Sequence, residues 1–442
     1  MNKIEQNKSL CIRQIADNRA EQISFYRFLH NRRVNQEEII KNQLERYQLG
    51  EQEGHLLCIS DTTEISLGHH KGRLKPRGLG YIGKTKGLGF YVHPTLLIKV
   101  EEDRKERIIG YSSIQMWHRE ELKETWKNKR YKSLAIEEKE SYKWIKAAQE
   151  SQARLPKAQL LTMIGDREAD IYEEFVRVPN QRTQLLIRSC QNRSLKDGTR
   201  LFEKLSESEI MGEYEVLLEG DQRVGRERRK ARLEVRWEKV EIAAPHTYKG
   251  KEKSLRICAI EAREVGSEAP ELIHWRLLTT HEVKDLADAK RMIGYYQLRW
   301  QIEQLFRVLK RQGLALEASQ LESAEAIKKI CVMAIPTALQ IMQLVEEREG
   351  NGQRELSEAF TRSEEECLRA VLPRIEGKTQ KQKNPHSPKK MAWGAWIIAR
   401  MGGWSGYQSD RPPGVITMKN GLKKFNQYYQ GYRLAREDVC TQ

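Results

Sequence analysis

Cysteine is scarce in this chain, and its placement excludes several classes of protein. The seven cysteines are scattered and no two of them form a CxxC pair, a pattern that indicates reduced thiols rather than disulfides or a zinc site. The mean hydropathy is −0.73, and no uninterrupted apolar run is long enough to cross a membrane. The opening MNKIEQNKSL has no apolar signal core. We therefore expect a cytoplasmic protein without a membrane span or a secretory signal.

Cations outnumber anions despite an abundance of both. The 78 Lys and Arg residues against 62 Asp and Glu give a net charge of +16 and a pI of about 9.4. This surplus favours a polyanionic partner such as nucleic acid, although a merely basic soluble protein would have the same composition. A length of 442 residues is enough for about two to four domains.

The apolar pattern predicts a mixed sheet with helices on its faces. Three strands come first, and helices then alternate with two further strands, an order typical of an α/β domain. A stretch of alternating strands without a long helix follows, which predicts a β-rich insertion before helices return at 282–312. The strands expected in the first part are residues 55–61, 89–100, 107–118, 160–166 and 184–189, and the helices are residues 134–152 and 168–177.

These changes of pattern divide the chain into five predicted regions. A short helical region comes first, then an α/β domain interrupted by the β-rich insertion, and last a second helical region. In chain order the regions are 1–48, 49–189 (first part of the α/β domain), 190–274 (insertion), 275–345 (second part of the α/β domain) and 346–442.

Two predicted strands end in an aspartate. Asp61 follows HLLCIS, and Asp166 follows LLTMIG. Functional sites collect at strand ends in open sheets with helical crossovers, so the two carboxylates are candidate ligands of a shared site. Each residue also has an ordinary interpretation: Asp166 could cap the following helix, and Asp61 could serve a turn.

A third carboxylate lies in a row of cations on a predicted helix. At about 100° per residue, Tyr296, Arg299, Glu303, Arg307 and Lys310 fall on one stripe, and a separate apolar stripe faces a core. A solvated face with ordinary ion pairs would show the same pattern. Three converging carboxylates would need neutralising cations, and two Mg²⁺ ions would supply them and support phosphodiester cleavage.

The order and spacing of these residues resemble a known family. SDTT at 60–63, DREADIY at 166–172 and Tyr296-x2-Arg299-x3-Glu303-x6-Lys310 resemble the DDE transposases of the insertion-sequence-four type, which move DNA by cut and paste. The resemblance extends from FYRFLHN at residue 25 to ARMGGWSGYQSDRPPG at 399–414. It implies an RNase H-like catalytic fold, interrupted by a β-rich insertion and flanked by helical N- and C-terminal regions.

The resemblance also assigns roles to individual residues. It implies that Asp61, Asp166 and Glu303 bind two Mg²⁺ ions, for which Mn²⁺ would substitute. It places DNA phosphates at a group of polar residues and a flipped base against a tryptophan, which could equally be an ordinary core residue. The phosphate contacts would be Tyr296, Arg299, Arg307 and Lys310, and the tryptophan would be Trp275 with Trp300 as its neighbour.

The implied activity is cleavage of double-stranded DNA at transposon ends, with hairpin formation and resolution, followed by strand transfer into target DNA by a homodimer. Only 60 residues precede Asp61, fewer than relatives have, which leaves a truncated, inhibitory end-binding relative as the alternative. A general metal-dependent nuclease is a second alternative, and it would cleave without preference for ends.

Overall fold

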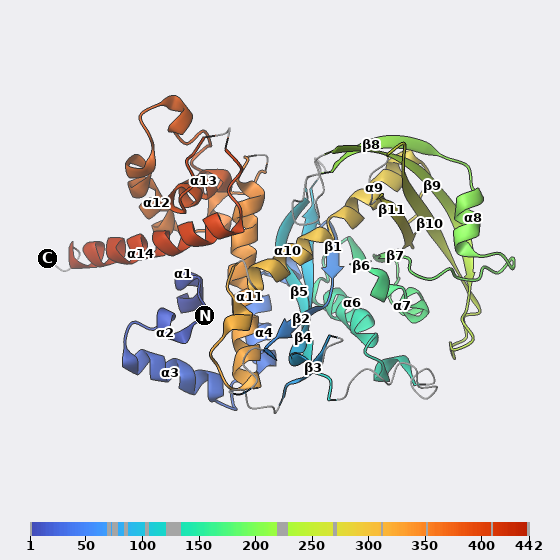
Figure 1. Cartoon of the computed structure of the whole chain (residues 1–442), viewed down its shortest axis with the longest axis horizontal. Helices are drawn as coiled ribbons and strands as arrows, with labels where there is room; N and C mark the ends of the chain where they lie inside the picture. Colours follow the sequence, from blue (N-terminus) through green and yellow to red (C-terminus); the bar gives the residue numbers. More distant parts are fainter. Residues whose placement is uncertain are drawn as a thin grey trace.

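The strands of this computed structural model form one large mixed sheet beside a helical body (Figure 1). Both chain ends that the figure marks lie on the helical side, and α11 stands between the helical body and the sheet. The structure describes residues 2–68, 72, 78–83, 87–101, 106–120, 134–218, 229–267, 272–310, 313–350, 352–407 and 410–439.

The sheet contains eleven strands in the described part of the chain. Their order is β2-β4-β1-β6-β7-β11-β10-β9-β8, and β3 and β5 also pair with β4. The pairs β1–β6 and β6–β7 are parallel, and the other pairs are antiparallel. The strands are β1 His55–Ser60, β2 Thr63–Ser66, β3 Gly80–Ile82, β4 Gly87–Val100, β5 Glu106–Trp117, β6 Leu160–Gly165, β7 Thr183–Arg188, β8 Gly212–Leu218, β9 Arg229–Ala243, β10 Ser254–Val265 and β11 His274–Thr279.

Helices cover the sheet and build the rest of the chain. Helix α6 packs on β1, β4, β5 and β6, while α9 lies against β7 and β9. The helices are α1 Asn2–Asn7, α2 Ile12–Ile15, α3 Arg19–His30, α4 Gln36–Arg46, α6 Tyr142–Arg154, α7 Tyr172–Arg177, α8 Leu201–Glu207, α9 Leu286–Gln297, α10 Trp300–Leu309, α11 Ala324–Glu347, α12 Arg362–Ile375, α13 Met391–Met401 and α14 Val415–Val439.

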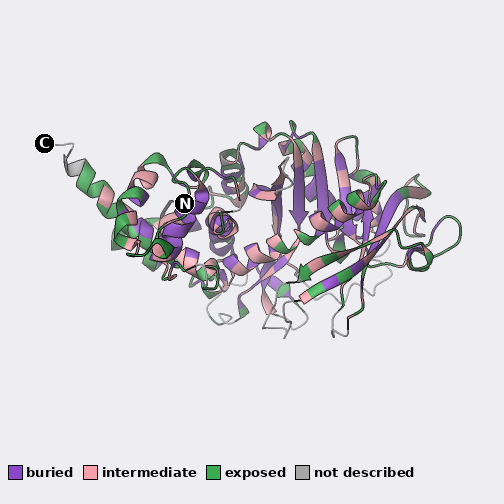
Figure 2. Cartoon of the chain, turned by 90° about the horizontal axis from the view of Figure 1, so that it is seen from above, coloured by how far each residue is buried: buried purple, intermediate pink, exposed green. Residues whose placement is uncertain are grey.

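The two strands that precede the aspartates are buried over almost their whole length. Five of the six residues are buried in β1 and likewise in β6, and Figure 2 shows the central strands almost wholly buried. Strands covered on both faces read as continuous apolar runs, which is why HLLCIS and LLTMIG show no polar alternation. A rigid centre therefore holds both aspartates.

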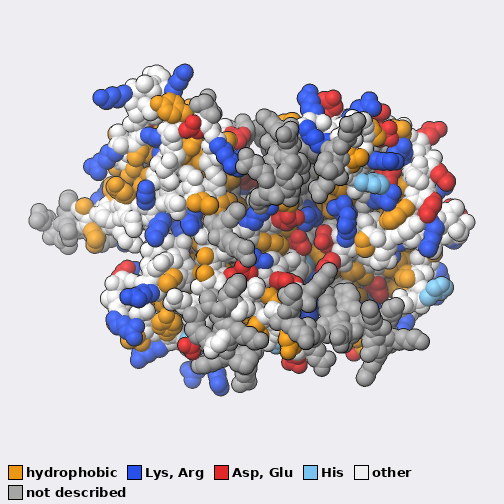
Figure 3. All heavy atoms as spheres, viewed as in Figure 1, with side chains coloured by type: hydrophobic (Ala, Val, Ile, Leu, Met, Phe, Trp, Pro, Cys, Tyr) orange, Lys and Arg blue, Asp and Glu red, His pale blue; other side chains and the backbone are white. Residues whose placement is uncertain are grey.

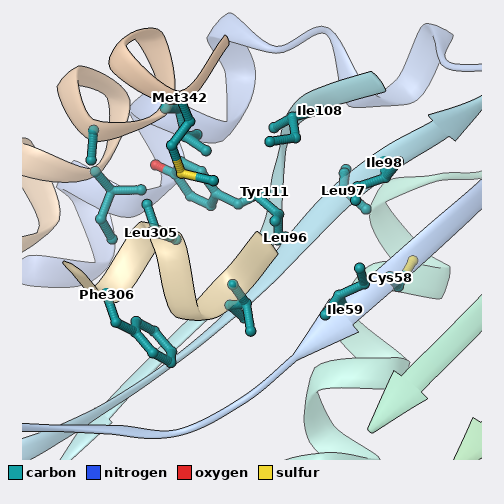
Figure 4. Packing of buried hydrophobic residues seen from close by; sticks show 14 of the residues in the cluster. Cys58, Ile59, Leu96, Leu97, Ile98, Ile108, Tyr111, Leu305, Phe306 and Met342 are labelled. Carbon is teal, nitrogen blue, oxygen red and sulfur yellow. The ribbon is translucent and has the colours of Figure 1, made fainter. Parts of the chain in front are cut away.

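Helices α10 and α11 join the sheet to the helical body. Figure 4 shows Tyr111 of β5 against Met342 of α11, with Leu305 of α10 beside Tyr111. Helix α11 has the length and composition of a membrane span, but 72% of its apolar window is buried inside the protein. It packs on α10, α13 and α14, so its apolar surface is explained by core packing.

Strand pairing and helix ends add detail to the sequence expectations. Strands β8, β9 and β10 of the predicted β-rich insertion continue the central sheet through β11, which pairs with β7. The helix expected over 282–312 is two helices, α9 and α10, which meet at Leu298 and Arg299. At the start of α12, Thr361 and Glu364 form a capping box, because Thr361 has the extended backbone that a cap needs.

Candidate active site

Asp61 and Asp166 leave the sheet side by side. Strands β1 and β6 are parallel neighbours with Ile59 opposite Ile164, so the residue that follows each strand emerges at the same edge. Both aspartates make local hydrogen bonds as well. Asp61 accepts one from the Thr62 amide at 2.7 Å, and Asp166 accepts one from the Glu168 amide at 2.8 Å, capping the short 3₁₀ turn Arg167–Ala169. The ordinary interpretation of Asp166 as a cap is thus confirmed, whereas Asp61 and Thr62 form no turn.

Arg299 connects this edge to Glu303. Its Nη1 lies 3.1 Å from Asp61 Oδ2, and its Nη2 lies 2.5 Å from Glu303 Oε1. The three side chains are 17–28% exposed, so the contacts are partly shielded from water. One guanidinium therefore holds carboxylates that are 242 positions apart in the chain.

The pKa of Asp61 responds to both of the other carboxylates. It is raised to about 7 by burial, by the negative charge of Asp166 and, to a smaller extent, by Glu303, against the lowering effects of the Thr62 amide and of Arg299. Burial also raises the pKa of Asp166, against the lowering effects of Arg299 and Lys143. Negative charge at this edge is thus only partly compensated, which is the condition that favours binding of a divalent cation.

The three carboxylates are not prearranged around a metal ion. No group of three His, Cys, Asp or Glu side chains is arranged to hold a metal ion within the described residues. The guanidinium of Arg299 instead lies against two of the three carboxylates. The donor set fits Mg²⁺, a hard cation that prefers carboxylate oxygens, provided that the side chains rearrange around it.

Tyr296 and Trp275 flank this edge. Tyr296 is 4% exposed, and its ring meets that of Trp275 edge to face, with centroids 6.1 Å apart. Burial raises the pKa of Tyr296, while the charges of Arg299 and Arg188 lower it. The Tyr296 hydroxyl is buried and donates to no acceptor among the described residues, while Arg188 approaches it as a hydrogen-bond donor. Such a hydroxyl is available to a ligand oxygen.

Arg188 is a cation that the sequence analysis missed. It ends β7, and Ile187 is opposite Gly165, so Arg188 stands beside Asp166 at the same edge as both aspartates. Its charge also reaches Tyr296. The only signal in the sequence was an arginine at the end of a predicted strand, which becomes informative once strand pairing is known.

The remaining cations of the predicted stripe lie further along α10. The Arg307 guanidinium stacks over the ring of Trp300 at 4.7 Å, and Trp300 is 45% exposed. Lys310 ends α10, and its charge acts on Cys331 in α11. The structure thus brings Tyr296, Arg299 and Glu303 to the aspartates, while Arg307 and Lys310 extend a cationic surface away from them.

Other residues of the DREAD segment hold the backbone around Asp166. The buried carboxylate of Asp170 forms an ion pair with Arg193 and accepts hydrogen bonds from the amides of Cys190 and Gln191 at 2.9 and 3.1 Å. Glu168 pairs with Lys143 at 3.1 Å. The DREAD segment therefore contains one candidate metal ligand, Asp166, and two residues, Glu168 and Asp170, whose ion pairs hold the surrounding backbone.

Gly165 sets the turn into Asp166 because a side chain has no room there. A Cβ atom at this position would lie 2.4 Å from Ala169 Cβ. We expect Gly165→Ala to lower the free energy of unfolding by about 1–3 kcal/mol through overpacking, and to displace Asp166. Chemical denaturation checks this, with Gly431→Ala as the control, since nothing lies within 4 Å of that position. Equal stability of the two variants would contradict the packing argument.

His93 contacts the residue that follows Asp61. It is fully buried, its Nδ1 lies 2.9 Å from the Thr62 hydroxyl, and burial and Lys143 keep its pKa well below the usual value. Its ring packs edge to face on Trp144, with centroids 4.7 Å apart. His93 is thus a neutral packing partner of the loop that carries Asp61.

Comparison with known proteins finds a matching family model and a similar solved structure. A family model described as "Transposase DDE domain" matches residues 89–335, a range that includes Asp166 and Glu303 and begins after Asp61. A cryo-EM structure of a piggyBac transposase synaptic complex with hairpin DNA is similar at 9% sequence identity and a TM-score of 0.34, over 68% of this chain and 48% of that one. The chain thus spans about half the length of that protein. The predicted DDE transposase resemblance is confirmed, and this chain belongs to the transposase DDE domain family.

Proposed function

We propose that this chain is a cut-and-paste DNA transposase of the insertion-sequence-four type, with an RNase H-like catalytic domain. Asp61, Asp166 and Glu303 would hold two Mg²⁺ ions. The observation that carries the proposal is the contact of one guanidinium with Asp61 and Glu303, next to an Asp166 that shifts the pKa of Asp61. Three remote segments of the chain thus supply acidic oxygens to one edge of the sheet.

Bound Mg²⁺ would supply Lewis-acid activation of the attacking oxygen and stabilisation of the leaving oxygen. The chain's own residues would position the DNA. Arg188 and Arg299 can each hold a phosphate oxygen by charge-assisted hydrogen bonds, and the Tyr296 hydroxyl can donate to a third. Arg307 and Lys310 would follow the backbone further along α10.

The proposed reaction is a series of in-line displacements at phosphorus. Water cleaves one strand at the transposon end and leaves a 3′-hydroxyl. This hydroxyl attacks the opposite strand, which closes a hairpin on the transposon end and releases the flanking DNA. A second water opens the hairpin, and the 3′-hydroxyl then attacks target DNA. Trp275 would stack on a base flipped out at the tight bend, with exposed Trp300 nearby.

The proposed partners follow from charge and from the need to join two ends. Lys and Arg side chains are scattered over both halves of the face in Figure 3, with Asp and Glu side chains among them. The net charge of +16 favours a DNA partner. We assign end recognition to residues 1–48 and dimerisation to residues 346–442. The other boundaries, 49–189, 190–274 and 275–345, remain predictions, as does the cytoplasmic location.

The test replaces one carboxylate without changing its shape. Glu303→Gln is expected to reduce Mn²⁺-dependent nicking of supercoiled DNA on the order of 10³-fold or more, because an amide cannot supply the negative charge that the metal site needs. Glu207→Gln, on the exposed side of α8, is the matched control and should nick as the wild type does. Undiminished nicking by Glu303→Gln would refute the assignment.

The wild type also separates the proposal from its alternatives. A wild type that binds DNA but never cleaves it with Mn²⁺ would favour the inhibitory end-binding relative. Cleavage that shows no preference for the ends of the element, compared with unrelated DNA of equal length, would favour a general nuclease.

A further inference from the structure

We propose that Arg299 closes the carboxylate site of the free protein, and that metal ions enter when Arg299 turns to a DNA phosphate. The inference rests on the proposed function and extends it, because it gives the metal and the DNA an order of binding. Its basis is the position of the guanidinium, which touches Asp61 and Glu303 at once.

The guanidinium competes directly with a metal ion. A cation that binds both Asp61 and Glu303 would meet the positive charge of Arg299, which now donates to Asp61 Oδ2 and Glu303 Oε1. Arg299 stays protonated at any pH at which the protein folds, so deprotonation cannot release it. While the carboxylates are ionised, a competing cation on them or a competing anion on the guanidinium can release Arg299.

An anion site lies within reach of the same side chain. The charge of Arg299 acts on Tyr296, and so does that of Arg188. Arg188 also approaches the buried Tyr296 hydroxyl as a hydrogen-bond donor, but the hydroxyl itself donates to no acceptor among the residues that the structure describes. A phosphate oxygen placed there would meet two arginines and one hydroxyl donor, a set that can draw the guanidinium from its carboxylates.

The consequence is positive coupling between DNA and metal. If phosphate draws Arg299 away from Asp61 and Glu303, then bound DNA raises the affinity for the metal, and bound metal raises the affinity for DNA by the same factor. The free protein would then bind Mg²⁺ weakly and would not assemble a cleavage site in the absence of a substrate.

Mn²⁺ binding to the full chain without DNA tests the proposal, measured by the electron paramagnetic resonance of free Mn²⁺. Arg299→Gln is expected to bind Mn²⁺ about tenfold more tightly than the wild type, or more, since one charge-assisted bond to each carboxylate is removed. Arg307→Gln is the matched control. It removes the same charge from the same helix, but Arg307 stacks on Trp300, so its Mn²⁺ affinity should stay within about twofold of the wild type.

The outcomes distinguish the role of Arg299 from the assignment of the metal ligands. Equal Mn²⁺ affinity in the wild type and Arg299→Gln would overturn the role of Arg299. Equal gains in Arg299→Gln and Arg307→Gln would also overturn it, because the cause would then be general charge. Asp61→Asn should lose the Mn²⁺ site, and retention of that site would overturn the metal-ligand assignment itself. Thermal melting with and without Mn²⁺ verifies that each variant is folded.

Discussion

Asp61→Asn should stabilise the metal-free protein while it abolishes DNA cleavage. The pKa of Asp61 is raised to about 7 by burial and by Asp166, whereas an unfolded aspartate has a pKa of about 3.9. Between these values the folded protein binds more protons than the unfolded chain, so the free energy of unfolding falls as the pH rises from about 4 to 7. Asparagine carries no such charge and removes this cost.

The expected gain is about 1–3 kcal/mol at pH 8, with little gain near pH 4. Denaturant unfolding at both pH values measures it, and a plasmid nicking assay measures the loss of cleavage. Asp197→Asn is the control, since Asp197 is exposed and bonds only to Thr199 in the hydrogen bonds described. A variant that is destabilised at pH 8, or one that still cleaves DNA, would contradict the account of Asp61 as a strained functional carboxylate.

Asp170→Ala should have the opposite signature, a large loss of stability. The side chains of Asp170 and Arg193 are 0% and 6% exposed, so alanine leaves a buried guanidinium and two backbone amides without their acceptor. Breaking a buried pair in this way costs about 3–5 kcal/mol. The buried Glu174, whose pKa is raised by burial and by Asp170, would gain a little from the loss of a nearby charge.

Denaturant unfolding of Asp170→Ala and of the exposed Asp197→Ala measures the difference. The double variant Asp170→Ala/Arg193→Met should recover part of the loss, because an apolar side chain removes the uncompensated charge. If Asp170→Ala unfolds at the same denaturant concentration as the wild type, Asp170 is not the anchor of the loop after β7.

The sequence predicted the position of the site better than its chemistry. Asp61 and Asp166 could be predicted because each follows an apolar run, and sites collect at the ends of paired strands. Glu303 could be predicted from its spacing from Tyr296 and Arg299. The break between α9 and α10 could not be predicted, since Leu298 and Arg299 both keep right-handed helical backbone angles and the 3.6-residue stripe continues across the break.

The parts of the site that the sequence could not predict depend on contacts between segments far apart in the chain. Arg188 becomes a site residue only through the pairing of β6 with β7, and Lys143 acts on Asp166 from α6, far from any motif. The bridging role of Arg299 needs β1 and α10 to meet. Sequence periodicity describes one element at a time, so it cannot supply any of these three relations.

The central claim is that Asp61, Asp166 and Glu303 form one metal-binding site, and a crystal soaked in Mn²⁺ tests it most directly through anomalous scattering. The account predicts Mn²⁺ peaks coordinated by all three carboxylates, about 4 Å apart if both ions are bound, with Arg299 withdrawn from Asp61 and Glu303. Peaks that lie elsewhere, or carboxylates that stay bonded to Arg299 at saturating Mn²⁺, would contradict it.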